Sequence, residues 1–185
     1  MAGRAGEPAA EARAQNQTTV TESAAVGAVR QARTHPAYQV FAAQLRLPTM
    51  TVLDGSTTLN VGGRLKLDLG KPDETMAQEG IALAKLLEIP QGVFATLVRK
   101  LSFNARLGGE DLAQQFQTSV VDYKYLSERW QQYHPGKAGE PVRTEALKCL
   151  QAGDLERAWQ LFIELPKPSP PTGLRTGSPQ QSTGQ

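Results

Sequence analysis

Cysteine and aromatic residues are scarce in this chain, and their scarcity excludes several classes of protein. Of the 185 residues one is Cys, and only 6% are aromatic. A single thiol excludes an intrachain disulfide framework and a zinc finger, because both need at least two cysteines. The 17 glycines are far fewer than the one residue in three that collagen requires.

Long apolar runs are also missing. A membrane-spanning helix needs about 20 mostly apolar residues, and the best run, from Ile81 to Leu87, is interrupted by Lys85. The sequence also lacks the basic start and apolar stretch of a secretory signal. We therefore expect a soluble, cytoplasmic protein without membrane insertion. The formal charge of +2 is too small to indicate a nucleic-acid or membrane partner by itself.

Composition divides the chain into a folded centre and two tails. Residues 1–35 have no Leu and little that could form a core, and residues 166–185 are rich in Pro, Gly, Ser, Thr and Gln. Such segments bury too little apolar area to offset the entropy of ordering. We predict disordered tails over 1–35 and 166–185, and one folded domain over 36–165. The sequon at Asn16 is attributed to chance, and the prolines from Pro166 to Pro171 are interpreted as a spacer rather than a groove ligand.

The centre is predicted to be an α+β domain, mostly helical, with five to six helices and a small antiparallel hairpin or meander near residues 49–69. Asp54-Gly55 and Gly62-Gly63 are typical of tight hairpin turns. Leu65, Leu67 and Leu69 alternate with charged residues, as in a strand with one buried face.

The remaining elements follow a helical period. Pro36 opens a short helix, and Asp73 or Thr75 is expected to cap a longer one that ends at Leu87. Its expected inward residues are Met76, Ile81, Leu83, Ala84 and Leu87. Further helices are predicted from Pro90, from near Glu110 to Tyr133, over 141–152, and over 155–165 with Asp154 as a cap; the helix from Pro90 is expected to bury Val93, Phe94, Leu97, Val98 and Leu101.

Few residues are suited to catalysis. His35 and His134 each precede a proline, as turn residues do, and Cys149 lies on an amphipathic helix where a half-buried thiol is ordinary. No nucleophile and base stand at a defined spacing, and no phosphate-binding loop or metal-ligand motif is present. We expect no enzyme activity, no catalytic residue, no metal site and no cofactor.

One segment, residues 80–101, carries a more specific pattern. Ala84 is the small residue that would let two helices approach, and four apolar residues are spaced as buried anchors around a turn: Leu87, Ile89, Phe94 and Leu97. The segment resembles the helix-turn-helix DNA-binding family. It departs from that family at Glu88, where glycine is usual.

The resemblance implies a second helix whose outer side contacts double-stranded DNA. Gln and Thr side chains can bind base edges, and Arg and Lys can bind phosphates. No acidic residue occurs between Ile89 and Gly109. The predicted nucleic-acid-binding residues are Gln91, Thr96, Arg99, Lys100 and Arg106, and the predicted function is that of a non-catalytic regulatory or accessory protein. If the preceding hairpin acted as a wing, Arg64 and Lys66 would lie near a phosphate.

Two alternatives stay open. A plain helical hairpin produces the same apolar pattern, with Arg99 and Lys100 on a solvated face. The chain could also be a helical protein-protein adaptor or assembly factor that contacts no nucleic acid, with a partner on the long helix or the C-terminal hairpin. That hairpin resembles one unit of a tetratricopeptide or pentatricopeptide repeat. Tyr123, Trp130 and Trp159 are the residues that would serve the adaptor, provided that they form one exposed patch.

Overall fold

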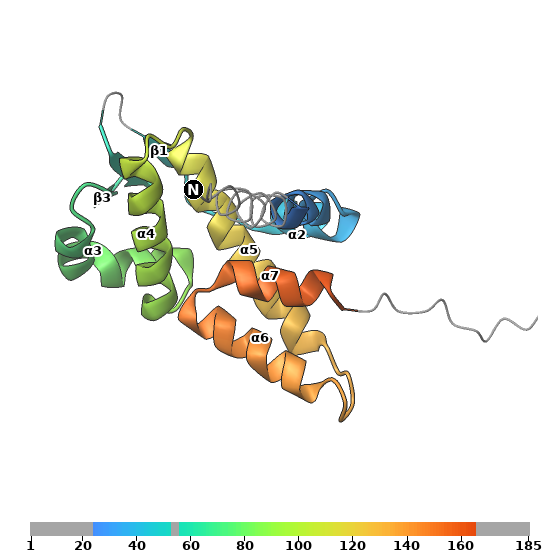
Figure 1. Cartoon of the computed structure of the whole chain (residues 1–185). Coiled ribbons are helices and arrows are strands. Elements are labelled where there is room, and N and C mark those ends of the chain that lie inside the picture. Colours follow the sequence, from blue (N-terminus) through green and yellow to red (C-terminus); the bar gives the residue numbers. More distant parts are fainter. Residues whose placement is uncertain (1–23, 53–55, 166–185) are drawn as a thin grey trace, which may run out of the picture.

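The computed structural model describes residues 24–52 and 56–165. These residues form a mostly helical α+β fold with a small antiparallel sheet, as predicted (Figure 1). The predicted tails up to residue 23 and from residue 166, the Asn16 sequon and the Asp54-Gly55 turn lie outside the described residues.

The sheet is a meander of three short strands in the order β1-β2-β3: β1 (Met50–Val52), β2 (Thr58–Val61) and β3 (Leu65–Asp68). The turn between β2 and β3 contains Gly62 and Gly63 at φ 65° and 75°. Glycine adopts this left-handed conformation without steric cost, so the hairpin prediction is confirmed at this turn. Leu67 and Leu69 are fully buried, as their alternation with charged residues predicted.

Helix α3 (Pro72–Leu87) begins at a proline, which fixes φ and loses no helical hydrogen bond at this position. Two predictions about α3 are wrong. Neither Asp73 nor Thr75 caps it: the helix starts before them, and the Thr75 hydroxyl accepts a hydrogen bond from the Asp68 N–H at 3.1 Å. Ile81 is 62% exposed, because the buried side of α3 passes through Leu83 and Leu87 and turns Ile81 outward.

Helix α4 (Gln91–Arg106) follows after a short turn, and α5 (Leu112–Gln132) is the longest helix. Helices α6 (Glu140–Ala152) and α7 (Leu155–Ile163) form a hairpin, in which the Asp154 carboxylate accepts from the Arg157 N–H as the predicted cap. Helix α5 contacts α2, α4, α6, α7 and β1. It therefore connects the sheet with α3 and α4 on one side to the α6–α7 hairpin and α2 on the other (Figure 1).

Some residues that were predicted to belong to the N-terminal tail are part of the fold. Residues 24–33 are helical, and they precede α2 (Pro36–Gln44), whose N-cap is His35. Arg33 Nη2 lies 2.6 Å from a carboxylate oxygen of Asp122 on α5, and the Tyr38 hydroxyl donates to the other oxygen at 2.6 Å. Residues 24–35 thus belong to the folded unit instead of to the tail.

No single described helix is long and apolar enough to cross a membrane; α3 and α4 meet the length and composition criteria only as a pair, bent by 110°.

Candidate nucleic-acid interface

The α3-turn-α4 unit has the angle of a helix-turn-helix. The two helix axes bend by 110° across residues 88–90. Helix-turn-helix units join two helices at about 90–120° through a turn of about three or four residues. An antiparallel hairpin would instead place neighbouring helices within about 20° of antiparallel. The 110° angle lies within the range of helix-turn-helix units and outside that of neighbouring bundle helices.

The turn depends on Glu88, the residue at the position where the family usually has glycine. Glu88 adopts φ 55° and ψ 45°, the left-handed conformation that glycine adopts most easily. Its N–H bonds to the Lys85 carbonyl at 3.1 Å, and the Ile89 N–H bonds to the Ala84 carbonyl at 3.1 Å. This pair of bonds is a Schellman motif, which usually places glycine where Glu88 stands. Glu88 therefore differs from the usual glycine in residue type, but its backbone adopts the same left-handed conformation.

The inner sides of α3 and α4 are buried in the hydrophobic core. Ala84 is 2% exposed, so that α4 can approach α3 closely. The buried side of α4 carries the five residues predicted to face inward, Val93, Phe94, Leu97, Val98 and Leu101, each at most 4% exposed. Ser102 also belongs to this side, and its hydroxyl donates to the Leu69 carbonyl at the end of β3. The orientation of α4 is therefore fixed by the core and by the sheet.

The outer side of α4 presents three cationic side chains to solvent: Arg99, Lys100 and Arg106. Within residues 24–52 and 56–165, no carboxylate pairs with any of the three. The nearest acidic residues in sequence are Glu110, four residues after Arg106, and Glu88, whose carboxylate lies 3.9 Å from the Lys124 ammonium group of α5. The face is thus locally positive although the whole chain is nearly neutral.

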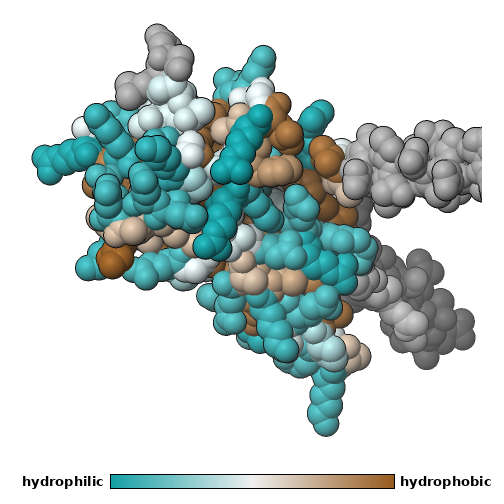
Figure 2. All heavy atoms as spheres, turned by 60° about the vertical axis from the view of Figure 1, so that its left-hand side comes forward, coloured by the Kyte–Doolittle hydropathy of each residue, from teal (hydrophilic) through white to brown (hydrophobic). Residues whose placement is uncertain are grey.

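The start of α4 is open. Gln91 is exposed, and a Cβ added at Gly92 would meet no atom within 4 Å. The N-cap is Pro90, whose side chain makes no capping hydrogen bond, so the first backbone N–H groups of α4 are not capped. Figure 2 brings this side of the molecule forward and shows a largely hydrophilic surface with small separate hydrophobic areas.

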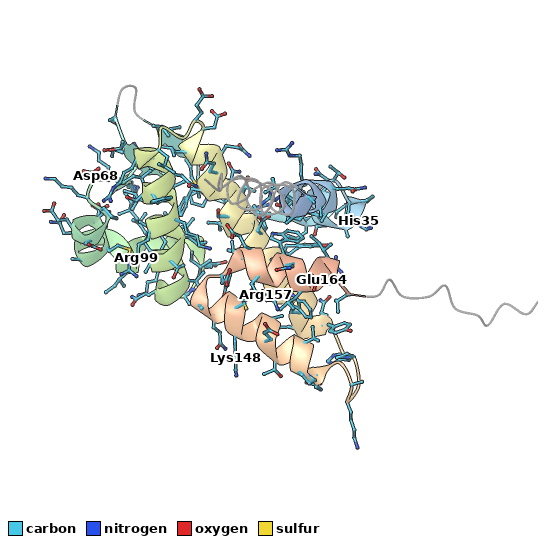
Figure 3. All side chains as sticks on the ribbon, viewed as in Figure 1. His35, Asp68, Arg99, Lys148, Arg157 and Glu164 are labelled. Carbon is cyan, nitrogen blue, oxygen red and sulfur yellow. The ribbon has the colours of Figure 1, made fainter. Side chains whose placement is uncertain are left out.

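Thr96 differs from the other predicted contact residues. It is half-buried, and its hydroxyl donates to the Gly92 carbonyl at 3.1 Å. The turn between α6 and α7 lies against it: a Cβ added at Gly153 would be 2.7 Å from the Thr96 Cβ. Thr96 therefore positions α4 against the C-terminal hairpin and forms one border of the exposed face. Figure 3 shows Arg99 on α4, on the far side of the molecule from His35 beside α2.

The three residues predicted for a protein partner do not form one exposed patch. Trp130 is fully buried, Trp159 is 2% exposed, and Tyr123 is half-buried. Trp159 stacks on Tyr125 with ring centroids 6.0 Å apart, and Trp130 packs edge-on against Phe162 at 6.2 Å. The two tryptophans join α5 to α7 inside the core.

The described residues offer little acid-base or metal chemistry. None of their His, Cys, Asp and Glu side chains form a group of three that could hold a metal ion. Burial and the nearby carboxylates of Asp154 and Glu145 raise the pKa of the half-buried Cys149, so that its thiol stays protonated at neutral pH. His35 Nδ1 accepts from the Ala37 N–H as a helix cap.

The Arg33–Asp122–Tyr38 cluster is the polar feature that sequence patterns did not reveal. Asp122 is 2% exposed and accepts from both partners. Burial and the adjacent Asp122 carboxylate raise the pKa of Tyr38 well above its ordinary value. Burial lowers the pKa of Arg33, but the hydrogen bond and charge of Asp122 more than offset this, and the net pKa is raised. No local signal marks a pair 89 residues apart in sequence.

Comparison of this chain with protein-family models, curated proteins and solved structures finds no match.

Proposed function

We propose that this protein is a non-catalytic regulatory or accessory protein that binds double-stranded DNA through its α3-turn-α4 unit. The observation that carries the proposal is the 110° bend across a turn closed by Glu88 in the left-handed conformation. In this arrangement α4 is the recognition helix, and its exposed face bears Gln91, Arg99, Lys100 and Arg106.

The charge on α4 supports this proposal over an adaptor role. A duplex presents a dense row of phosphates, and unpaired surface cations bind it by displacing condensed counterions. The adaptor depended on an exposed patch of Tyr123, Trp130 and Trp159, and the two tryptophans are buried. DNA binding is therefore the function that the accessible side chains favour.

The test is a titration of labelled duplex DNA with the full chain at about 50 and about 200 mM salt. If three cations on α4 contact phosphates, affinity should fall about 40-fold between the two salt concentrations, and only about fourfold in an Arg99→Ala, Lys100→Ala double variant. The matched control, Arg30→Ala with Lys137→Ala, removes two exposed cations from elsewhere on the surface and should retain the wild-type salt dependence. Failure to bind duplex at the lower salt concentration would overturn the proposal.

A further inference from the structure

Phe103 is an exception among the large apolar residues of α4. The other five between Val93 and Leu101 are at most 4% exposed, whereas Phe103 is 61% exposed. Its ring takes part in none of the aromatic contacts within the described residues, which link residues such as Phe94 with Phe116. Packing within residues 24–52 and 56–165 therefore does not account for a phenyl ring at this position.

The ring stands on the same face as the cationic side chains. Phe103 follows Arg99 by four residues and precedes Arg106 by three, the spacings that bring side chains together on a helix surface. At 3.6 residues per turn, Phe103 is rotated by only about 20° from Gly92, three turns earlier. One line along α4 thus runs from the open backbone at Gly92, past Arg99, to an exposed ring flanked by two arginines.

The charge around the Phe103 ring indicates which kind of molecule would bind against it. No acidic residue lies between Ile89 and Gly109, and no described carboxylate pairs with Arg99, Lys100 or Arg106. An apolar surface surrounded by unpaired cations complements a polyanion that also presents apolar groups. Duplex DNA has both features: phosphates line the groove edges, and the C5-methyl group of thymine projects into the major groove. An RNA duplex does not fit, because its deep, narrow major groove does not admit side chains.

We propose that the ring of Phe103 contacts thymine methyl groups in the major groove and gives this protein a preference for thymine at one part of its site. The inference rests on the proposed function and extends it from phosphate binding to sequence preference. From Gln91 to Phe103 the helix rises about 18 Å, which spans about five base-pair steps. The preferred thymine therefore lies several base pairs away from any base that Gln91 contacts at the start of α4.

The test removes only the methyl group. The full chain first selects its preferred duplex from a random pool, and binding is then measured to that duplex and to a version in which deoxyuridine replaces every thymidine. The wild-type protein should bind the deoxyuridine version about fourfold more weakly for each methyl group that the ring of Phe103 would have covered. Phe103→Ala should bind both versions equally, with an unchanged salt dependence, and Phe103→Leu should show an intermediate difference.

The position of the sensitive thymine and a control variant show whether the effect comes from Phe103. Single deoxyuridine replacements should locate the sensitive thymine at a position distinct from the base pair whose identity stops mattering in Gln91→Ala. Val40→Ala removes an exposed apolar residue from α2, which is 56% exposed in the fold, and should keep full sensitivity to the methyl group.

Three outcomes would overturn the inference. Equal affinity of the wild-type protein for both duplexes would show that Phe103 does not contact thymine methyl groups, while leaving the proposed function intact. Unchanged discrimination by Phe103→Ala would assign the contact to another residue, and loss of a dimer in that variant by light scattering, with discrimination unchanged, would show that a second copy covers the ring. Selection of no duplex by the wild-type chain would overturn the proposed function as well.

Discussion

Two groups of cationic side chains in this molecule have opposite surroundings. Arg33 lies against the buried Asp122 carboxylate at 2.6 Å, with Tyr38 completing its hydrogen bonds. Arg99, Lys100 and Arg106 are exposed, and none is paired with a carboxylate of the described residues. A buried charge needs its partner to be tolerated at all, whereas a solvated charge without a partner stays available for a ligand. The comparison gives Arg33 a role in stability and supports the proposal that the three exposed cations bind a ligand.

The largest effect is expected at Asp122. Asp122→Ala leaves the buried Tyr38 hydroxyl and the partly exposed Arg33 guanidinium without their shared acceptor, and losing these two hydrogen bonds to a charged group should cost about 3 kcal/mol. Urea denaturation should show this loss in the free energy of unfolding, while the affinity of the folded protein for duplex DNA stays unchanged. Tyr38→Phe, which removes one hydrogen bond, should cost about 1 kcal/mol. A fully stable Asp122→Ala variant would contradict the structural role.

Gly153 lies against α4, and replacing it should lower both the stability of the fold and the affinity for DNA. Gly153 has φ 76°, and an added Cβ would be 2.7 Å from the Thr96 Cβ on α4. Strain and clash together should make Gly153→Ala about 2 kcal/mol less stable. Because Thr96 packs α4 against this turn, the proposed binding of DNA by α4 should also weaken at temperatures where the variant is folded. Gly92→Ala is the matched control: it meets no neighbouring atom and should keep full stability.

Alkaline pH should reduce the contribution of the Arg33–Asp122–Tyr38 cluster to the stability of the fold. The pKa of Tyr38 in the folded protein is raised by burial and by Asp122, so the unfolded chain releases this proton first as pH rises above about 10. The contribution of Tyr38 to stability is therefore complete below pH about 10 and is lost above it, by about 1 kcal/mol near pH 11. Unfolding curves between pH about 8 and about 11 should show a smaller alkaline loss for Tyr38→Phe than for the wild-type protein. Equal losses of stability in the two proteins would contradict the raised pKa of Tyr38 in the folded state.

The smallest effect is expected at Glu88. Its carboxylate is 85% exposed and precedes the first residue of α4 by three positions, where it would repel a bound phosphate backbone. Glu88→Gln should tighten duplex binding about twofold at low salt, with the difference vanishing as salt screens the charge. Weaker binding by the variant would show that Glu88 does not face DNA. The control Glu156→Gln removes an exposed carboxylate from α7 and should not change affinity.

Local patterns predicted the parts of the fold that local physics determines. Gly62-Gly63 predicted a hairpin because few other residues adopt positive φ easily, and the apolar spacing from Val93 to Leu101 predicted the buried side of α4. Ile81 was misplaced because an apolar residue alone does not show on which side of a helix the core lies.

Features that depend on distant parts of the chain could not be predicted. Arg33 was assigned to a tail because nothing near it indicates Asp122. The contact between Thr96 and the turn at Gly153 likewise joins residues 57 positions apart. Of the six residues predicted for the outer side of α4, Gln91, Gly92, Arg99 and Lys100 are exposed and Ala95 and Thr96 are half-buried. Phe103 drew no prediction, because an exposed aromatic residue stands out only once the core is known.

The central claim is that the exposed face of α4 binds DNA while the Asp122 cluster serves the fold. The most direct measurement is a titration of the isotope-labelled full chain with duplex DNA, followed by NMR chemical shifts of each residue. Shifts should concentrate at Gly92, Arg99 and Phe103, and the signals of Arg33 and Asp122 should stay in place. Shifts that leave α4 unaffected and concentrate elsewhere, or no shifts at any duplex concentration, would contradict the account.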